Sequence, residues 1–242
     1  MLTDTAEAIR RASAAARDAV MSLDADMAAR LKTLYQDVIT EMQQRLRSAA
    51  DAADAVSVQR LNTYLTQAQN NLLELDRAQR GLLREGLTQA AEWGVKPWLE
   101  VGVSLDRLAD DAVRFVEHFV AADGLRLSDR LWRITSGTMN SLAETLRRNV
   151  VLGRDATQAA LEFTAKQQAL PLELRAALGK DRPTALGKAV DDVLRSEPGA
   201  AYAKALRVFR TEINRAHGEA YQRSAAQHPD VIGMQFMLSP NH

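Results

Sequence analysis

The chain has 242 residues, of which 46% are hydrophobic, 26% are charged and 5% are aromatic. This length and apolar content suffice for a buried core, and they exclude a chain that is disordered throughout. Lys and Arg together number 31, as do Asp and Glu, so the net charge of 0 provides no overall attraction to nucleic acid, an anionic membrane or an acidic partner. Cysteine is absent, which excludes disulfides, thiolate nucleophiles and cysteine-ligated zinc among these residues.

Signals for membrane insertion and secretion are missing from the sequence. No apolar run approaches the roughly 20 residues that a helix needs to span a bilayer. The residues from Met1 to Glu7 lack the basic stretch followed by an apolar one that marks a secretory signal. We therefore expect a chain that has no membrane span and is not secreted by that route.

The first part of the sequence predicts long helices. From Thr3 to about Ala49 the apolar spacing is helical, with a break expected near Ser22 or Asp24, either of which would cap a second helix. Apolar residues, with one glutamine among them, then recur at positions 58, 61, 65, 68, 72, 75, 79 and 82. About three heptads of this spacing are typical of a core helix in a bundle or, less often, of a coiled coil. The helix at residues 58–86 is therefore the candidate for self-association.

The middle of the sequence predicts a turn and two further helices. Residues 93–98 contain a glycine and a proline, and we interpret them as a turn that ends the preceding helix. Residues 104–124 predict a helix closed by an Asp-Gly stop, and residues 128–153 predict a longer helix that begins at a serine cap and ends at a glycine.

Helix length and punctuation change near residue 153, so we predict two regions. Residues 1–153 should form an elongated helical bundle or a coiled-coil-like region. Residues 154–242 should form a compact helical region, with short helices at 156–169, 172–178 and 185–194 and a long final helix from 200 to about 227. The predicted fold class is therefore mainly α.

A single β-strand is expected after the final helix, at Val231–Leu238, because apolar residues are concentrated there beyond Pro229. One strand does not make a sheet, since its backbone groups need a partner strand. The strand either pairs with another chain or belongs to a longer protein from which further strands are missing, and we favour the second. The compact region is then part of an incomplete α+β module.

No residues are spaced as a catalytic or metal site. His118, His217, His228 and His242 form no HExxH or similar pairing. A phosphate-binding loop, a dinucleotide-binding turn and a nucleophile elbow are also absent from the sequence. We interpret the histidines as packed or solvated, and we expect no enzyme activity, no cofactor and no metal.

The strongest candidate for binding lies in the final helix. Arg210, Asn214, His217 and Tyr221 are spaced i, i+4, i+7 and i+11, which places them on one face of a helix. A polar stripe of this kind can bind a partner, although a solvated helix face is the more common explanation of such a pattern. Spacing alone therefore favours the solvated face.

The same helix also resembles part of a known family. It contains the run RTEINRAH at residues 210–217, which is followed by DVIGMQF at 230–236 and by Ser239-Pro240. This ordered combination resembles the RTE-x-N-x-A core, and the strand after it, of the phage head morphogenesis proteins, the Mu F-like minor head protein family. Residues 149–155 fit the glycine-containing step that precedes this core, so the likeness covers roughly residues 130–240. Two features depart from the pattern: Phe236 stands where the family often has Trp, and the usual downstream segment with Cys or His is absent.

The resemblance implies a minor structural protein that acts in head morphogenesis near the portal, in the virion or in the cytoplasm of an infected bacterial host. It implies binding residues at positions of the family motif, namely Arg210, Thr211, Glu212, Asn214 and His217. It also implies that Arg210 and Glu212 are polar anchors that hold the final helix against its neighbours. Each then needs its own partner, because residues two apart on a helix face different directions.

The implied partners are the portal and other head proteins. DNA contact is a further expectation that the net charge does not support, since the candidate basic residues are flanked by acids. Two alternatives stay open: a helical delivery or packing part of a phage-associated toxin or enzyme, and a coiled-coil interaction module.

Overall fold

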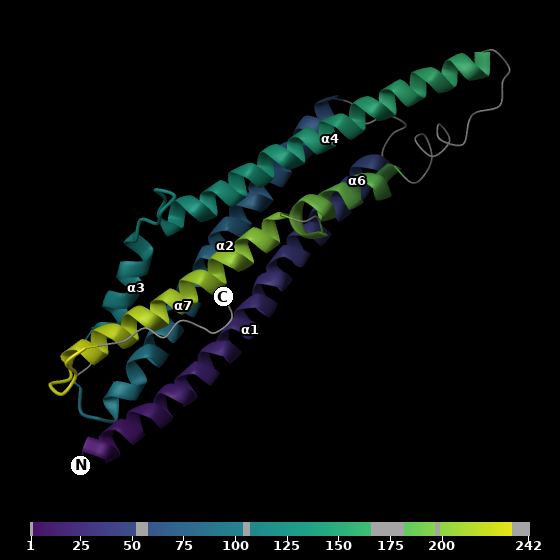
Figure 1. Ribbon diagram of the computed structural model, residues 1–242. Coiled ribbons are helices and arrows are strands. Elements are labelled where there is room, and N and C mark those ends of the chain that lie inside the picture. The colour runs from purple at the N-terminus through teal and green to yellow at the C-terminus, as the bar shows by residue number, and fades with distance from the viewer. Residues whose placement is uncertain (1, 52–57, 104–106, 166–181, 197–198, 234–242) are drawn as a thin grey trace. The chain divides into compact units, whose positions relative to one another are not determined.

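The computed structural model describes residues 2–51, 58–103, 107–165, 182–196 and 199–233 (Figure 1). Within these ranges every regular element is helical and no strand occurs. The mainly α class predicted from the sequence is therefore confirmed for the described residues. In chain order the elements are α1 (Leu2–Asp51), α2 (Val58–Leu99), α3 (Leu108–His118), α4 (Leu127–Ala165), α6 (Arg182–Asp191), the π-helical η1 (Asp192–Ser196) and α7 (Ala201–Gln227).

Contacts between residues divide the chain into two compact units, each assembled from separate stretches of sequence. The first unit consists of the described residues of Met1–Ala29, Gly81–Asp129 and Arg207–His242, and the second of those of Arg30–Arg80 and Arg130–Leu206. Helices α1, α2 and α7 each contribute one stretch to each unit. The division into residues 1–153 and 154–242 cuts the sequence at one point, whereas each of these units joins separate stretches. The predicted division stays a prediction.

Helix α1 is continuous, so the break predicted near Ser22 is wrong. The Ser22 hydroxyl does not cap a new helix but donates a hydrogen bond to the Asp18 carbonyl oxygen, 3.0 Å away and one turn earlier. Leu23 is buried, which keeps the helix packed through the expected break. Serine bonds local backbone groups inside a helix as well as at its start, and the sequence pattern does not separate the two cases.

Helix α2 continues through Gly94 and Pro97 to Leu99, so the turn predicted at residues 93–98 is also wrong. Gly94 is small because α7 passes against it: a Cβ added there would lie 2.9 Å from Cβ of Ala220 and closer still to the backbone of His217. Pro97 lies in the last turn, two residues before the helix ends, so the backbone hydrogen bond that it cannot donate is one of the last in the helix. The chain reverses after Leu99, where Gly102 adopts a positive φ of 85°.

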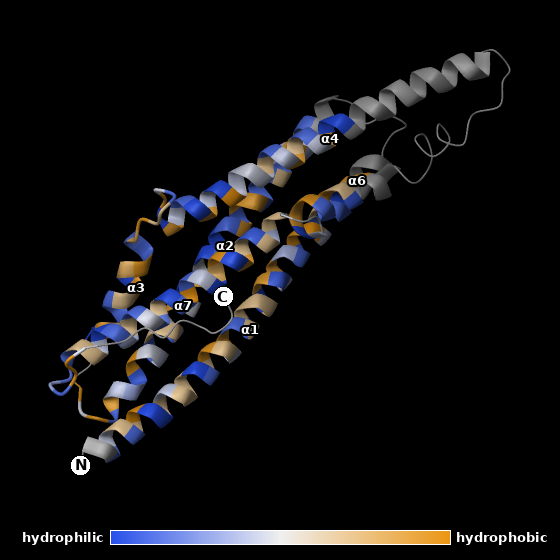
Figure 2. Cartoon of the chain, in the orientation of Figure 1, coloured by the Kyte–Doolittle hydropathy of each residue, from blue (hydrophilic) through white to orange (hydrophobic). Residues whose placement is uncertain are grey.

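Buried apolar side chains occur in both units, and apolar residues alternate with polar ones along the helices (Figure 2). In the first unit the core contains Ala16, Val20, Leu23, Met27, Leu83, Leu87, Ala90, Phe209, Ile213, Ala216 and Ala220. In the second unit it contains Leu31, Tyr35, Met42, Leu65, Leu72, Leu75, Leu131, Leu142, Leu146, Leu194 and Ala205. A large apolar side chain that is fully buried stabilises the fold by about 1.5–3 kcal/mol relative to its exposed state, so these faces hold the helices together.

The apolar stripe predicted on α2 is confirmed where side chains are described. Its members at positions 65, 68, 72, 75, 79 and 82 are all buried. Because the stripe packs within the chain, it behaves as the core side of a bundle helix. Self-association through residues 58–86 stays a prediction, and it would have to use the exposed side of the helix.

The remaining predicted boundaries agree only in part. Helix α4 begins at Leu127, where the Asp129 carboxylate accepts a hydrogen bond of 3.1 Å from the Arg126 backbone N–H, and it continues past the predicted stop at Gly153 to Ala165. A single glycine inside a helix costs only about 1 kcal/mol relative to alanine, which helix-forming neighbours on both sides offset. The final helix ends at Gln227, as predicted.

The predicted strand cannot be compared in full. Residues 231–233 have no regular structure, and residues 234–238 lie outside the described residues. The short helix predicted at 172–178 also lies outside them, whereas the one predicted at 185–194 corresponds to α6 and η1.

Candidate functional site

The polar stripe of α7 lies along α1 within the first unit. At one end Arg210 Nε donates a hydrogen bond to Asp24 Oδ2 at 3.1 Å. At the other end the Ser13 hydroxyl donates a long hydrogen bond of 3.4 Å to the Tyr221 hydroxyl oxygen. Because Tyr221 meets the earlier residue of α1 and Arg210 the later one, the two helices are antiparallel here. We call this line of facing side chains the α1–α7 seam; it consists of Ser13, Arg17, Met21, Asp24, Arg210, Asn214, His217 and Tyr221.

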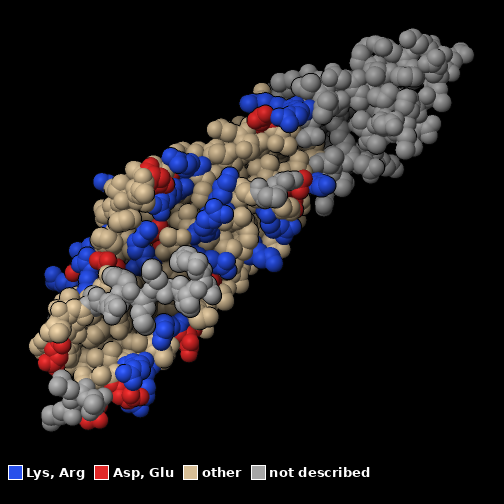
Figure 3. All heavy atoms as spheres, viewed as in Figure 1, with Lys and Arg blue, Asp and Glu red and all other residues tan. Residues whose placement is uncertain are grey.

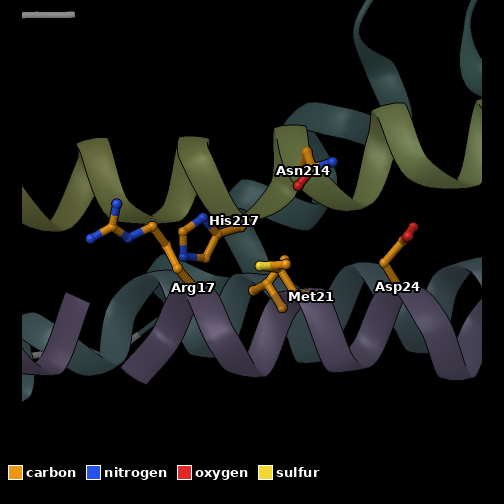
Figure 4. A pocket seen from close by; sticks show the side chains of 6 residues that line it. Arg17, Met21, Asp24, Asn214 and His217 are labelled. Atoms are coloured by element: carbon orange, nitrogen blue, oxygen red, sulfur yellow. The ribbon is translucent and has the colours of Figure 1, made fainter. Parts of the chain in front are cut away.

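The middle of the seam is open. A hollow of ≈ 370 Å³ is lined there by Arg17, Val20, Met21 and Asp24 of α1 and by Asn214 and His217 of α7. Figure 4 shows the His217 ring between the side chains of Arg17 and Met21, with Asp24 farther along α1. The hollow thus lies between the two polar contacts that close the seam at its ends.

His217 is the most unusual group of the hollow. Its Nε2 atom is buried, yet it has no hydrogen-bond partner among the described residues. Burial lowers the pKa of His217 below its ordinary value of 6.5, and the positive charge of Arg17 lowers it further. The imidazole is therefore mostly neutral at pH 7, and it retains an unused hydrogen-bonding nitrogen.

The other family-motif positions have separate surroundings. Asn214 lines the hollow, and its side-chain amide donates a hydrogen bond of 2.9 Å to the Arg210 carbonyl oxygen. Arg210 has a partner on a neighbouring helix, Asp24 of α1, but its side chain is 55% exposed, so this contact is a surface ion pair. Thr211 is exposed and does not line the hollow.

Glu212 is buried, and its ion pair is formed within α7. Its side chain is only 1% exposed, and its carboxylate is paired with Arg215 one turn later on α7. The Arg215 guanidinium lies over the Phe119 ring, 4.4 Å from the ring centroid. Arg223 and Phe115 repeat this arrangement at 5.6 Å, so stacked cations join α7 to α3 and the residues just after it.

The α1 half of the seam was not among the residues predicted from the sequence. Ser13, Arg17, Met21 and Asp24 recur every three or four residues and therefore share one face of α1. That spacing was available in the sequence, but α1 has many polar residues at similar intervals. Which of them meets α7 depends on how two helices nearly 200 residues apart pack together.

A second polar cluster lies in the second unit and is closed on itself. The Asp76 carboxylate accepts hydrogen bonds from Thr135 at 2.9 Å and from Arg80 Nε at 2.6 Å. Gln79 donates to the same carboxylate at 3.3 Å, and the Tyr35 hydroxyl donates to Gln79 at 3.2 Å. Burial, and then the charge of Asp76, raise the pKa of Tyr35. Because its groups bond one another, this cluster is explained by helix packing.

The other described histidines, His118 and His228, each contact a group close to them in the fold. A ring nitrogen of His118 lies 2.8 Å from the Arg114 carbonyl oxygen, and the ring of His228 is tilted against Trp98; His242 lies outside the described residues. Where side chains are described, no three His, Asp or Glu residues gather as metal ligands do. None of the described helices combines the length and the apolar content of a membrane span.

No protein-family model, curated protein or solved structure matches this chain. The likeness to the Mu F-like family therefore depends on the motif residues alone. Of these, Asn214 and His217 meet at the hollow, Arg210 closes one end of the seam, and Glu212 is buried elsewhere on α7.

Proposed function

We propose that this chain is a minor structural protein of a tailed phage or prophage that acts in head morphogenesis near the portal. The observation that carries the proposal is the RTEINRAH run of α7, followed by the DVIGMQF segment and Ser-Pro, in the order that the family motif has them. The burial of Glu212 supports the anchoring role that the motif implies for this residue. The protein then works by packing against portal and head proteins, in the virion or in the infected cell.

The surface is compatible with contacts to proteins more than with contacts to DNA. Lys and Arg are balanced by Asp and Glu in the sequence, and acidic side chains are interspersed among the basic ones on the face shown in Figure 3. DNA-binding proteins usually concentrate basic residues on one face, because contacts with phosphate supply most of their non-specific affinity. DNA contact is therefore not part of the proposal.

The genome around the coding sequence provides the first test. We expect portal and large terminase genes beside it, and we expect the protein in purified virions or proheads by mass spectrometry. Neighbouring genes without any head component, together with absence from the particles, would refute the proposal. A toxin or nuclease domain encoded in the same reading frame would favour the alternative of a helical delivery part.

A variant test asks whether the motif matters for assembly. In a phage whose copy of the gene is deleted, we expect Glu212→Gln to complement poorly and Glu219→Gln to complement well. Glu219 is a matched control on the same helix, because its ion pair with Arg223 is more exposed than the pair of Glu212. Equal yields of filled heads from the two variants would contradict a role for the motif.

A further inference from the structure

The α1–α7 seam is satisfied at its two ends and unsatisfied between them. Arg210 bonds Asp24 at one end, and Tyr221 meets Ser13 at the other. One turn inward from Tyr221, His217 lies beside Arg17, a cation that disfavours the charged imidazole. Packing alone does not favour an arginine beside a buried, unpartnered histidine, because the histidine loses solvation and the neighbouring cation disfavours its charged form.

The charge of this middle section is positive and uncompensated. Arg17 has no ion-pair partner among the described residues, and its side chain is exposed. The carboxylate that lines the same hollow, Asp24, is already bonded to Arg210. An anionic occupant would therefore gain the Arg17 guanidinium without displacing an existing ion pair, whereas a cationic occupant would be repelled by it.

The apolar part of the hollow is open to solvent. Met21 is 72% exposed although it lies between polar neighbours, while Val20 beneath it is buried. Sites for free small molecules usually enclose most of the ligand, and a methionine so exposed does not provide such an enclosure. Flexible exposed methionines are common where a protein surface receives another protein's side chain.

We propose that this hollow is a docking site for an acidic segment of a partner protein. One carboxylate side chain of the partner bonds the Arg17 guanidinium beside the His217 ring, and an adjacent apolar side chain covers Met21. The occupant is identified by charge complementarity and by the open apolar surface beside it. The inference goes beyond the proposed function, since it holds whichever protein carries the acidic segment.

The test uses a short probe peptide and the full chain. The probe is the blocked dipeptide acetyl-Glu-Leu-amide, and the matched probe acetyl-Gln-Leu-amide differs only in its charge. Binding is followed by NMR, through the nitrogen and carbon signals of the histidine rings. A His217→Asn variant identifies the signals of His217. We expect the Glu probe at millimolar concentration to shift the His217 signals in a saturable manner, and the Gln probe to leave them in place.

Variants distinguish this site from non-specific attraction to a basic surface. Arg17→Gln should weaken binding of the Glu probe about tenfold or more, because it removes a charge-assisted hydrogen bond. Arg11→Gln is the control, since Arg11 is an exposed arginine on the same helix that does not line the hollow. The control should bind as the parent does.

Three results would overturn the proposal: equal shifts with the two probes, no saturable shift of His217 with the Glu probe, or equal losses in the Arg17 and Arg11 variants. None of these readouts depends on a phage. The docking site can therefore fail while the role in head assembly stands, and the reverse is also true.

Discussion

The two polar clusters of this protein use the same kinds of residue in opposite ways. Around Asp76 in the second unit, buried side chains from α1, α2 and α4 bond one another. Along the α1–α7 seam in the first unit, the ends are bonded but His217 keeps a buried nitrogen without a partner. A closed network fixes which helices pack together, whereas an unsatisfied group beside a hollow marks a place where something else can bind.

The largest effect is expected from opening the closed cluster. Asp76→Ala removes the shared acceptor of Thr135, Gln79 and Arg80, and it leaves the Thr135 and Gln79 side chains buried. Loss of one partner from a buried charged pair costs about 3–5 kcal/mol; because the Arg80 side chain is 34% exposed, we expect a loss toward the lower end of this range and a lower urea midpoint. Asp111→Ala is the control, because the ion pair of Asp111 with Arg114 is exposed and 4.0 Å long. Similar midpoints for the two variants would show that the cluster contributes little.

Glu212 should have the next largest effect. Its carboxylate is buried and charge-paired, so Glu212→Ala should reduce the free energy of unfolding by about 1.5–3 kcal/mol. Arg210→Ala and Arg223→Ala remove surface pairs and should each cost about 0–1 kcal/mol. Chemical denaturation of the three variants measures this order. A loss for Arg210→Ala as large as that for Glu212→Ala would contradict the placement of Arg210 at the surface.

Gly94 tests how closely α2 and α7 approach each other in the first unit. Gly94→Ala puts a methyl group against the backbone of His217 and Cβ of Ala220, so the helices must separate, at a cost of about 1–3 kcal/mol. Gly81→Ala, also in α2, meets nothing within 4 Å and should instead stabilise the helix by about 0.5–1 kcal/mol. Thermal unfolding should therefore move in opposite directions for the two variants. A shift of the same sign in both would show that the glycine is not needed for the contact.

The contrast between the two polar clusters also shows which features the sequence could predict. Local spacing identified the mainly α fold, the buried stripe of α2 and the end of the final helix at Gln227, because each depends on neighbours within a few turns. It failed at Ser22 and Gly94, where residues typical of helix ends serve another purpose inside a helix. The stripe of Arg210, Asn214, His217 and Tyr221 was found, but its partners on α1 were not, because helix periodicity does not state which faces meet.

The smallest effect concerns the pH dependence of stability, and it isolates the open middle of the seam. The pKa of His217 is lower in the folded chain than its ordinary value of 6.5, first because of burial and then because of Arg17. As the pH falls below about 6.5, the unfolded chain therefore binds this proton more readily than the folded chain does, and stability decreases. Above that pH the imidazole is neutral in both states and contributes no pH dependence of stability.

His217→Asn should flatten this part of the stability curve, and Arg17→Gln should flatten it less, because it removes only the second cause of the lowered pKa. Urea unfolding at several pH values between 5 and 8, the range in which histidine titrates, measures the stability of the parent and the variants. The titration of the other groups cancels when these stabilities are subtracted. If the parent and His217→Asn had parallel curves across this range, His217 would titrate alike in the folded and unfolded chains, and the unpartnered nitrogen of the seam would lose its importance.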